Sequence, residues 1–175
     1  MLTAGGEKSS GTGKLGVLGD THGQAEFLLP ALEILASQQV DAVLHCGDIG
    51  STQIVRLLSR WPTHYVLGNC DYDRDAPKLA AAMEGLGHTL HGRFADLTLG
   101  GRRIALLHGD DTRRLLEVVE GGEFDLVCSG HTHVASCQRR GGTVVLNPGA
   151  LYRANPHTIA IVDLAVMKVT PLVVS

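Results

Sequence analysis

The first half of the chain alternates between short apolar runs and longer segments with helical periodicity. The apolar runs, which predict buried strands, are residues 15–18, 42–44 and 65–67. The segments with helical periodicity are residues 24–37, 51–60 and 77–85. Ser51 is a favourable N-cap residue at the start of the second of these helices. This strand–helix–strand order predicts a parallel sheet with helices packed against its outside.

The second half is richer in strands and carries one more helix. Residues 94–99 alternate between apolar and polar positions, Gly100-Gly101 supplies a turn, and residues 103–107 form the returning arm of a hairpin. A helix is predicted over residues 112–120. The further strands are predicted over residues 124–128, 134–139, 143–146, 158–163 and 166–174. We therefore expect an α/β fold, a four-layer α-β-β-α sandwich of two mixed sheets flanked by helices.

Length and composition indicate one globular domain. The chain has 175 residues, of which 44% are hydrophobic and 19% are charged. Residues 1–13 are rich in Gly, Ser and Thr and show no apolar periodicity, so we interpret them as a disordered or expression-derived tail. Residues 14–175 are expected to form a single domain.

Charge and cysteine usage limit the partners and the compartment. The formal net charge of −3 argues against a stable nucleic-acid complex, because such a complex usually needs a basic surface. A small phosphate-bearing substrate is compatible with this charge if metal ions supply positive charge. No segment is apolar enough to span a bilayer and no signal peptide is recognisable, so no membrane association is expected. Four widely spaced cysteines indicate a reduced, cytoplasmic setting. Exposed hairpin edges would allow a homodimer.

Side chains of the metal-ligand type follow five of the apolar runs, at the point where each run ends. These seven residues are Asp20, His22, Asp48, Asn69, His108, His131 and His133. The carboxyl ends of strands in an α/β sheet lie along one edge, where ligands bind, so we expect these side chains to converge. Glycines beside nearly all of them permit tight turns and close backbone approach.

Each of these residues alone has a simpler explanation. Asp20 or Asp48 could cap the helix that follows it, Asn69 could be a turn residue, and His108 could be a hydrogen-bonded histidine at a strand end. The occurrence of all seven at strand ends favours a metal site instead. A tetrahedral zinc site needs only four ligands, whereas seven oxygen and nitrogen ligands suit two ions that share a carboxylate.

Five short segments, in their order along the chain, resemble the motifs of the calcineurin-like metallophosphoesterase superfamily. They are Asp20-x-His22, Gly47-Asp48, Gly68-Asn69-x-Asp71, His108 and Gly130-His131-x-His133. The short chain and the segments Gly68-Asn69-Cys70-Asp71 and Asn147-Pro148-Gly149 resemble its small bacterial and archaeal branch, the YfcE-like phosphodiesterases. The resemblance runs from about Leu15 to Asp163, nearly the whole folded chain.

The resemblance implies a hydrolase of small phosphoesters that holds two divalent ions. One ion would be bound by Asp20, His22, Asp48 and His133. The other would be bound by Asp48, Asn69, His108 and His131, with Asp48 as the bridge. A hydroxide shared by the ions would attack the phosphorus in line. Mn²⁺ is the favoured metal, and Fe, Ni, Zn and Mg are the alternatives.

The chain departs from the family next to Asn69. Many members have a His after this Asn that contacts phosphate or protonates the leaving group, whereas this chain has Cys70, whose neutral thiol is a poor substitute. The YfcE-like branch also carries Cys here, so the departure does not exclude activity. The weak thiol suggests substrates with activated or good leaving groups. Asp71 would orient the Asn69 loop, which makes Asp48, Asn69 and Asp71 the expected catalytic residues. Cys70 and Arg153 are the expected contacts to the substrate phosphate.

Two functions without catalysis compete with the phosphodiesterase. The Vps29-like retromer subunits resemble these enzymes but have lost site histidines and act as scaffolds. A regulatory domain could bind metal and a nucleotide without turning it over. The complete set of seven ligand residues in this chain favours the enzyme over the scaffold, whereas Cys70 in place of the usual His leaves the regulatory domain open.

Overall fold

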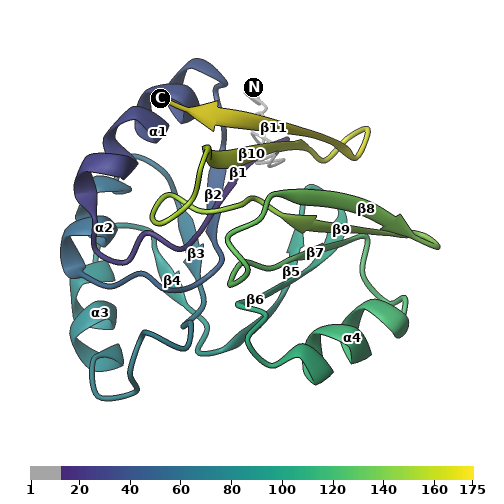
Figure 1. Ribbon diagram of the computed structural model, residues 1–175, viewed down its shortest axis with the longest axis horizontal. Coiled ribbons are helices and arrows are strands. Elements are labelled where there is room, and N and C mark those ends of the chain that lie inside the picture. Colours follow the sequence, from purple (N-terminus) through teal and green to yellow (C-terminus); the bar gives the residue numbers. More distant parts are fainter. Residues whose placement is uncertain (1–12) are drawn as a thin grey trace, which may run out of the picture.

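The computed structural model describes residues 13–175, so the tail predicted over residues 1–13 lies almost wholly outside the described residues. The described part of the chain forms eleven strands and four helices, arranged in two mixed sheets (Figure 1). Among these residues, no helix combines the length and the apolar character needed to cross a membrane.

The first sheet has the strand order β11-β10-β1-β2-β3-β4. Its strands are β1 (Lys14–Leu18), β2 (Ala42–His45), β3 (Thr63–Tyr65), β4 (Thr89–Leu90), β10 (His157–Asp163) and β11 (Lys168–Val174). Strands β1 to β4 are parallel, whereas β10 runs antiparallel to β1 and β11 antiparallel to β10. The carboxyl ends of β1, β2 and β3 therefore lie at the same edge of this sheet.

The second sheet has the strand order β5-β6-β7-β9-β8. Its strands are β5 (Phe94–Leu99), β6 (Arg102–Leu107), β7 (Leu126–Cys128), β8 (Ser136–Arg140) and β9 (Thr143–Asn147). The pairs β5–β6 and β8–β9 are antiparallel hairpins, as expected, but β6, β7 and β9 are parallel to one another. Helix α4 (Thr112–Glu120) makes the crossover from β6 to β7, so the second half is not built from hairpins alone.

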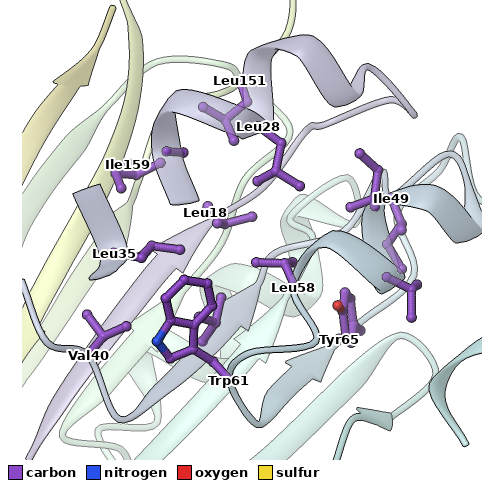
Figure 2. Close-up of a cluster of buried hydrophobic side chains, with 14 of the residues drawn as sticks. Leu18, Leu28, Leu35, Val40, Ile49, Leu58, Trp61, Tyr65, Leu151 and Ile159 are labelled. Carbon is purple, nitrogen blue, oxygen red and sulfur yellow. The ribbon is translucent and has the colours of Figure 1, made fainter. Parts of the chain in front are cut away.

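Three apolar cores separate four layers, which confirms the predicted α-β-β-α sandwich. Helices α1 (Ala25–Ser37), α2 (Thr52–Leu57) and α3 (Ala76–Met83) cover the outer face of the first sheet, with side chains such as Leu28, Leu58 and Tyr65 between them (Figure 2). The second core fills the space between the sheets, and the third lies under α4 (Figure 1). Burial of these apolar surfaces is the main force that holds the layers together.

One predicted strand is shifted, and one predicted N-cap residue is in place without its hydrogen bond. The strand predicted over residues 65–67 is β3 at Thr63–Tyr65, because residues 66 and 67 are buried without continuing the ladder. Ser51 occupies the N-cap position of α2, yet its side chain makes no capping hydrogen bond. Neither Asp20 nor Asp48 caps a helix either, since α1 begins after Gln24 and α2 after Ser51.

Candidate metal centre

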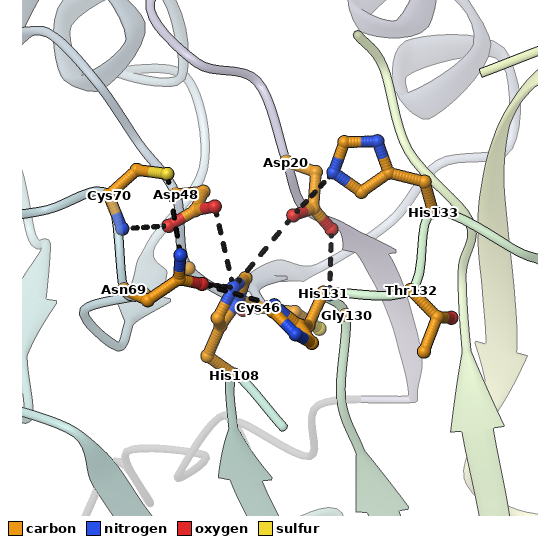
Figure 3. Close-up of polar contacts among 12 residues, drawn as sticks. Asp20, Cys46, Asp48, Asn69, Cys70, His108, Gly130, His131, Thr132 and His133 are labelled. Atoms are coloured by element: carbon orange, nitrogen blue, oxygen red, sulfur yellow. Dashed lines mark hydrogen bonds and ion pairs between the residues drawn. The ribbon is translucent and has the colours of Figure 1, made fainter. Parts of the chain in front are cut away.

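The seven candidate ligands converge where the carboxyl ends of strands from both sheets meet. The first sheet contributes Asp20 and His22 after β1, Asp48 after β2 and Asn69 after β3. The second sheet contributes His108 after β6, and His131 and His133 after β7. Figure 3 shows the side chains of His108, His131 and His133 close to those of Asp20, Asp48 and Asn69. The structure therefore brings together residues that lie up to 113 positions apart in the sequence.

Asp20 lies beside two histidine side chains. Its Oδ1 atom is 3.2 Å from Nε2 of His133 and 3.9 Å from Nε2 of His22. Its Oδ2 atom accepts a hydrogen bond of 3.1 Å from the backbone N–H of His131. Ligand atoms of Asp20, His22 and His133 all lie within 4.8 Å of one another, so one cation could contact all three.

Asp48 lies between two groups of ligands. Its Oδ2 atom is 3.4 Å from Nε2 of His22 and 3.4 Å from Nε2 of His108. Its Oδ1 atom accepts a hydrogen bond of 2.8 Å from the backbone N–H of Cys70. A second group of ligand atoms within 4.8 Å of one another comes from Asp20, Asp48 and His108. Oδ2 of Asp48 is thus equally distant from Nε2 of His22 and Nε2 of His108.

Asn69 completes the second group. Its Oδ1 atom lies 3.0 Å from Nε2 of His108 and 3.0 Å from Nδ1 of His131. The rings of these two histidines meet edge to face, with centroids 5.2 Å apart. The amide oxygen therefore points into the same space as the two imidazoles, as a shared cation would require.

Backbone carbonyl groups orient two of the histidine rings. Nδ1 of His108 donates to the carbonyl of Cys46 over 2.7 Å, and Nδ1 of His133 faces the carbonyl of Arg153 at 3.3 Å. Because a carbonyl oxygen only accepts, Nδ1 of each ring carries a proton, and Nε2 is the ring nitrogen turned toward a carboxylate. A metal ion would therefore bind each ring through Nε2, since Nδ1 is engaged with a carbonyl oxygen.

The carboxylates and His108 perturb one another electrostatically. Burial raises the pKa of Asp20, and His108 and His133 offset this only in part. Burial also acts to raise the pKa of Asp48, but its hydrogen bond to His108 and the charge of that ring hold the pKa well below its usual range. For His108, burial favours the neutral ring, yet Asp48 outweighs burial and raises the pKa. The site therefore favours a positive charge beside Asp48.

Two buried atoms show that a metal ion fits this site. Oδ1 of Asp20 and Nε2 of His22 are buried and have no hydrogen-bond partner among residues 13–175. Although His133 approaches Oδ1 to 3.2 Å, its orientation is not that of a hydrogen bond. Leaving a carboxylate oxygen buried and unpaired costs free energy, which a bound cation would recover. Oxygen and imidazole donors together suit divalent first-row ions.

The backbone around the site is held in an unfavourable conformation. Five of the seven candidate ligands have a positive φ angle: Asp20 (52°), His22 (45°), Asp48 (54°), His131 (70°) and His133 (59°). This left-handed region costs roughly 1–3 kcal/mol for a residue other than glycine, and such residues cluster at functional sites. Side-chain placement at this site is therefore maintained by the surrounding structure.

A match to a protein family agrees with this geometry. The model of the calcineurin-like phosphoesterase superfamily domain matches residues 14–167. The chain belongs to this superfamily. It is a hydrolase of the metallophosphoesterase type, and its family implies divalent metal ions.

Curated relatives of this superfamily member come from archaea and bacteria. A phosphodiesterase of Methanocaldococcus jannaschii is 25% identical over 153 residues, which cover 86% of this chain and 92% of the relative. A probable metallophosphoesterase of Bacillus subtilis is 30% identical over 147 residues, which cover 77% of this chain and 73% of the relative.

Solved structures share the fold of this superfamily member. An archaeal phosphodiesterase aligns with a TM-score of 0.84 at 25% identity, over 91% of this chain and 99% of its own. The YfcE phosphoesterase of E. coli aligns with a TM-score of 0.64 at 19% identity, over 93% and 100% of the two chains. Vacuolar protein sorting 29 of Cryptosporidium parvum aligns equally well, with a TM-score of 0.64 at 21% identity, over 92% and 96%. The fold is therefore shared by proteins named as enzymes and by sorting proteins.

The two predicted substrate contacts, Cys70 and Arg153, present different groups to the centre. Sγ of Cys70 lies within 4.8 Å of ligand atoms of His22 and Asp48. Burial and the charge of Asp48 raise the pKa of this thiol, so it remains neutral at pH 7. Arg153 reaches the site through its backbone carbonyl, while its guanidinium lies over the ring of Tyr152, 5.2 Å from the centroid.

Asp71 occupies the orienting position expected for it. Its carboxylate accepts hydrogen bonds of 3.0 Å from the backbone N–H groups of Ile49, Gly50 and Gly68. It thereby ties the loop after β2, which carries Asp48, to the loop after β3, which carries Asn69.

Thr21 and His45 are supporting residues that the sequence analysis did not single out. His45 is fully buried, and burial lowers its pKa to about 3, so the ring is neutral. Its Nδ1 accepts from the backbone N–H of Gly47, which leaves Nε2 to donate to Oγ1 of Thr21 over 3.0 Å. Thr21 in turn donates to the backbone carbonyl of Ile49. Their only sequence signal was their position: Thr21 lies inside the Asp20-x-His22 segment, and His45 precedes the Gly47-Asp48 segment by two residues.

Asn147 supports the loop that carries His131 and His133. Its Nδ2 donates to the carbonyl of Gly130 over 2.8 Å and to Oγ1 of Thr132 over 3.1 Å, and its Oδ1 accepts from the backbone N–H of Gly149. We expect Asn147→Ala to weaken Mn²⁺ affinity about 10–100-fold, the usual range for a residue that orients metal ligands.

Isothermal titration of metal-stripped protein with Mn²⁺ measures this effect of Asn147→Ala. Thr143→Ala is the matched control, because Thr143 is also buried on β9 and also donates to a backbone carbonyl, that of Phe124, at the end of the strand away from the site. Equal Mn²⁺ affinities for the two variants would show that Asn147 does not orient the ligand loop.

Proposed function

We propose that this superfamily member is a dinuclear metal-dependent phosphodiesterase that acts on a small phosphoester. The observation that carries the proposal is the complete set of seven oxygen and nitrogen ligands around Asp48, which lies 3.4 Å from a histidine on either side. One ion would be held by Asp20, His22, Asp48 and His133. The other would be held by Asp48, Asn69, His108 and His131.

The protein's own groups would hold the two ions and border the substrate. When bound, the ions activate water as the nucleophile and neutralise charge on the phosphoryl oxygens. Asp48 and Asp20 supply the negative charge that keeps the ions in place, and the carbonyl of Cys46 keeps Nε2 of His108 turned toward them. Cys70 borders the site with a neutral thiol, which cannot protonate a leaving group as an imidazolium does.

Space on both sides of the ligands supports a diester over a monoester. A pocket of about 150 Å³ beside Cys70 is lined by Ser51, Asp75 and Lys78 among others. A larger pocket of about 290 Å³ adjoins Gly130 and His131 on the other side of the centre. A diester carries a substituent on either side of the phosphorus, whereas a monoester would leave one pocket without a function. The relative from M. jannaschii is also named a phosphodiesterase.

The finer assignments belong to the same proposal. We favour Mn²⁺ because the donor set contains oxygen and imidazole and no obligatory thiolate.

Residues 14–175 are treated as one domain. Four cysteines without disulfides, Cys46, Cys70, Cys128 and Cys137, agree with a reduced cytoplasmic setting. The homodimer stays a prediction, with exposed outer strands such as β8 available for pairing.

Hydrolysis of simple p-nitrophenyl esters tests the proposal. Metal-stripped protein should be inactive, and added Mn²⁺ should restore turnover of bis-p-nitrophenyl phosphate and of methyl p-nitrophenyl phosphate. The monoester p-nitrophenyl phosphate should be turned over less efficiently. Folded protein that binds Mn²⁺ but hydrolyses neither diester would exclude the enzyme and favour the scaffold or the metal-binding regulatory domain.

A further inference from the structure

Helix α4 covers only part of the outer face of the second sheet. It packs through Leu115, Val118 and Val119 over β6 and β7. The neighbouring strands β9 and β8 lie beyond it (Figure 1). Every residue of β8 is exposed. A groove therefore runs between α4 and β8, with β9 as its floor.

The two walls of this groove differ in chemistry. Leu115, Leu116 and Val119 of α4 form an apolar wall. The opposite wall is formed by Ser136, Gln138 and Arg140, which share one face of β8 because strand residues two apart point the same way. Leu116 is 58% exposed, so its side chain is accessible to a ligand in the groove.

The groove begins at the metal centre and extends away from it. Gly130, His131 and Thr132 line its inner end, and His131 also faces Asn69 across 3.0 Å. At its outer end it continues into a second hollow, and Leu116, Val119 and Arg140 line both. A phosphoryl group held beside His131 could thus extend one substituent directly into the groove.

We propose that this groove binds one substituent of the diester and selects a ring with apolar faces, polar edges and a second anionic group, as in a nucleotide. This proposal rests on the proposed function of the metal centre. Leu116 and Val119 would cover a face of the ring, Gln138 would hydrogen-bond its edge, and Arg140 would pair with the outer anion. Nη2 of Arg140 already donates to Oε1 of Gln138 over 3.3 Å, which leaves the amide N–H groups of Gln138 free for a ligand.

The polar wall argues against an acyl chain as the occupant. A hydrocarbon chain would displace water from Ser136 and Gln138 without replacing their hydrogen bonds, which costs free energy. A ring with donors and acceptors at its edge satisfies that wall while its faces cover the apolar one. The volume of about 290 Å³ is close to the lower end of the range of about 300–1,000 Å³ found for small-molecule sites.

Three diesters with the same leaving group distinguish the contribution of the groove to turnover from that of the metal centre. They are methyl p-nitrophenyl phosphate, thymidine 5′-(p-nitrophenyl phosphate), and the latter compound with a 3′-phosphate. We expect kcat/KM to rise at least about tenfold from the methyl to the thymidine ester, and again about threefold with the 3′-phosphate, a small gain because Arg140 is exposed and its charge is screened.

Leu116→Arg and Arg140→Ala test the two walls. Leu116→Arg should lower the thymidine-to-methyl ratio about tenfold, and Arg140→Ala should abolish the gain from the 3′-phosphate. Leu29→Arg is the control for the first variant, because Leu29 is 51% exposed on α1. Arg139→Ala is the control for the second, because Arg139 is the exposed neighbour of Arg140 on β8 and points to the other face. Both controls should leave all three rates unchanged.

The outcomes distinguish the two proposals. If the methyl ester is hydrolysed but the thymidine ester is no better, or if Leu116→Arg leaves their ratio unchanged, the groove proposal is overturned while the enzyme stands. If no diester is hydrolysed, binding of thymidine 3′,5′-bisphosphate by calorimetry decides the question independently. Binding that Leu116→Arg weakens about tenfold supports the groove, and binding that is absent or unchanged by Leu116→Arg overturns it.

Discussion

Asp48→Asn is expected to lower kcat/KM for bis-p-nitrophenyl phosphate by at least about 10²–10³-fold, the range found when one group that stabilises transition-state charge is removed. The amide keeps the shape of the side chain but lacks the negative charge that would lie between two ions. It also places a neutral group 3.4 Å from both His22 and His108. Steady-state kinetics in the presence of saturating Mn²⁺ measure the change.

Asp96→Asn is the matched control for Asp48→Asn. Asp96 is an exposed carboxylate on β5 that pairs with Arg103 over 2.8 Å, remote from the centre. An exposed ion pair contributes little to stability, so this variant should retain full turnover. Similar activity in the two variants would show that Asp48 does not hold the metal ions.

Gly68→Ala is expected to damage both the fold and the metal centre. A Cβ atom on Gly68 would overlap Oδ1 and the backbone nitrogen of Asp48, and backbone atoms cannot move aside as the end of a flexible side chain can. We expect the free energy of unfolding to fall by about 1–3 kcal/mol, as in other overpacked sites, and Mn²⁺ affinity to fall at least about tenfold. Urea unfolding and Mn²⁺ titration measure the two effects.

Gly142→Ala separates this close packing from the general cost of replacing a glycine. Gly142 lies in the turn between β8 and β9, has open space around it, and is not in the left-handed region. The substitution there should change the stability and the Mn²⁺ affinity little. If Gly68→Ala behaves like Gly142→Ala, the two loops are not packed as tightly as the structure indicates.

The sequence was sufficient to predict the convergence of the ligands because each one follows an apolar run. Parallel strands carry their carboxyl ends to the same edge, so Asp20, Asp48 and Asn69 had to meet once β1, β2 and β3 paired in parallel. The same reasoning applies to His108 and His131 after β6 and β7. The order of apolar runs and helical segments also predicted the four layers, because both sheets have apolar faces that other elements must cover.

Other features depended on tertiary contacts that no local pattern encodes. The hydrogen bond between His45 and Thr21 spans 24 residues, and that between Asn147 and Gly130 spans 17; an isolated His or Asn gives no sign of such a partner. The positive φ angles of the ligand residues arise where loops are confined by neighbouring loops. The groove beside α4 exists because one helix is too narrow to cover five strands, which only the sheet order reveals.

Counting bound metal while measuring turnover tests the central claim most directly. Metal-stripped protein would be titrated with Mn²⁺, and bound Mn²⁺ per chain would be determined alongside hydrolysis of bis-p-nitrophenyl phosphate. The account predicts two bound ions per chain, with turnover that rises as the second site fills, and fewer bound ions in Asp48→Asn. Full turnover with a single bound ion, or two bound ions without any turnover, would contradict it.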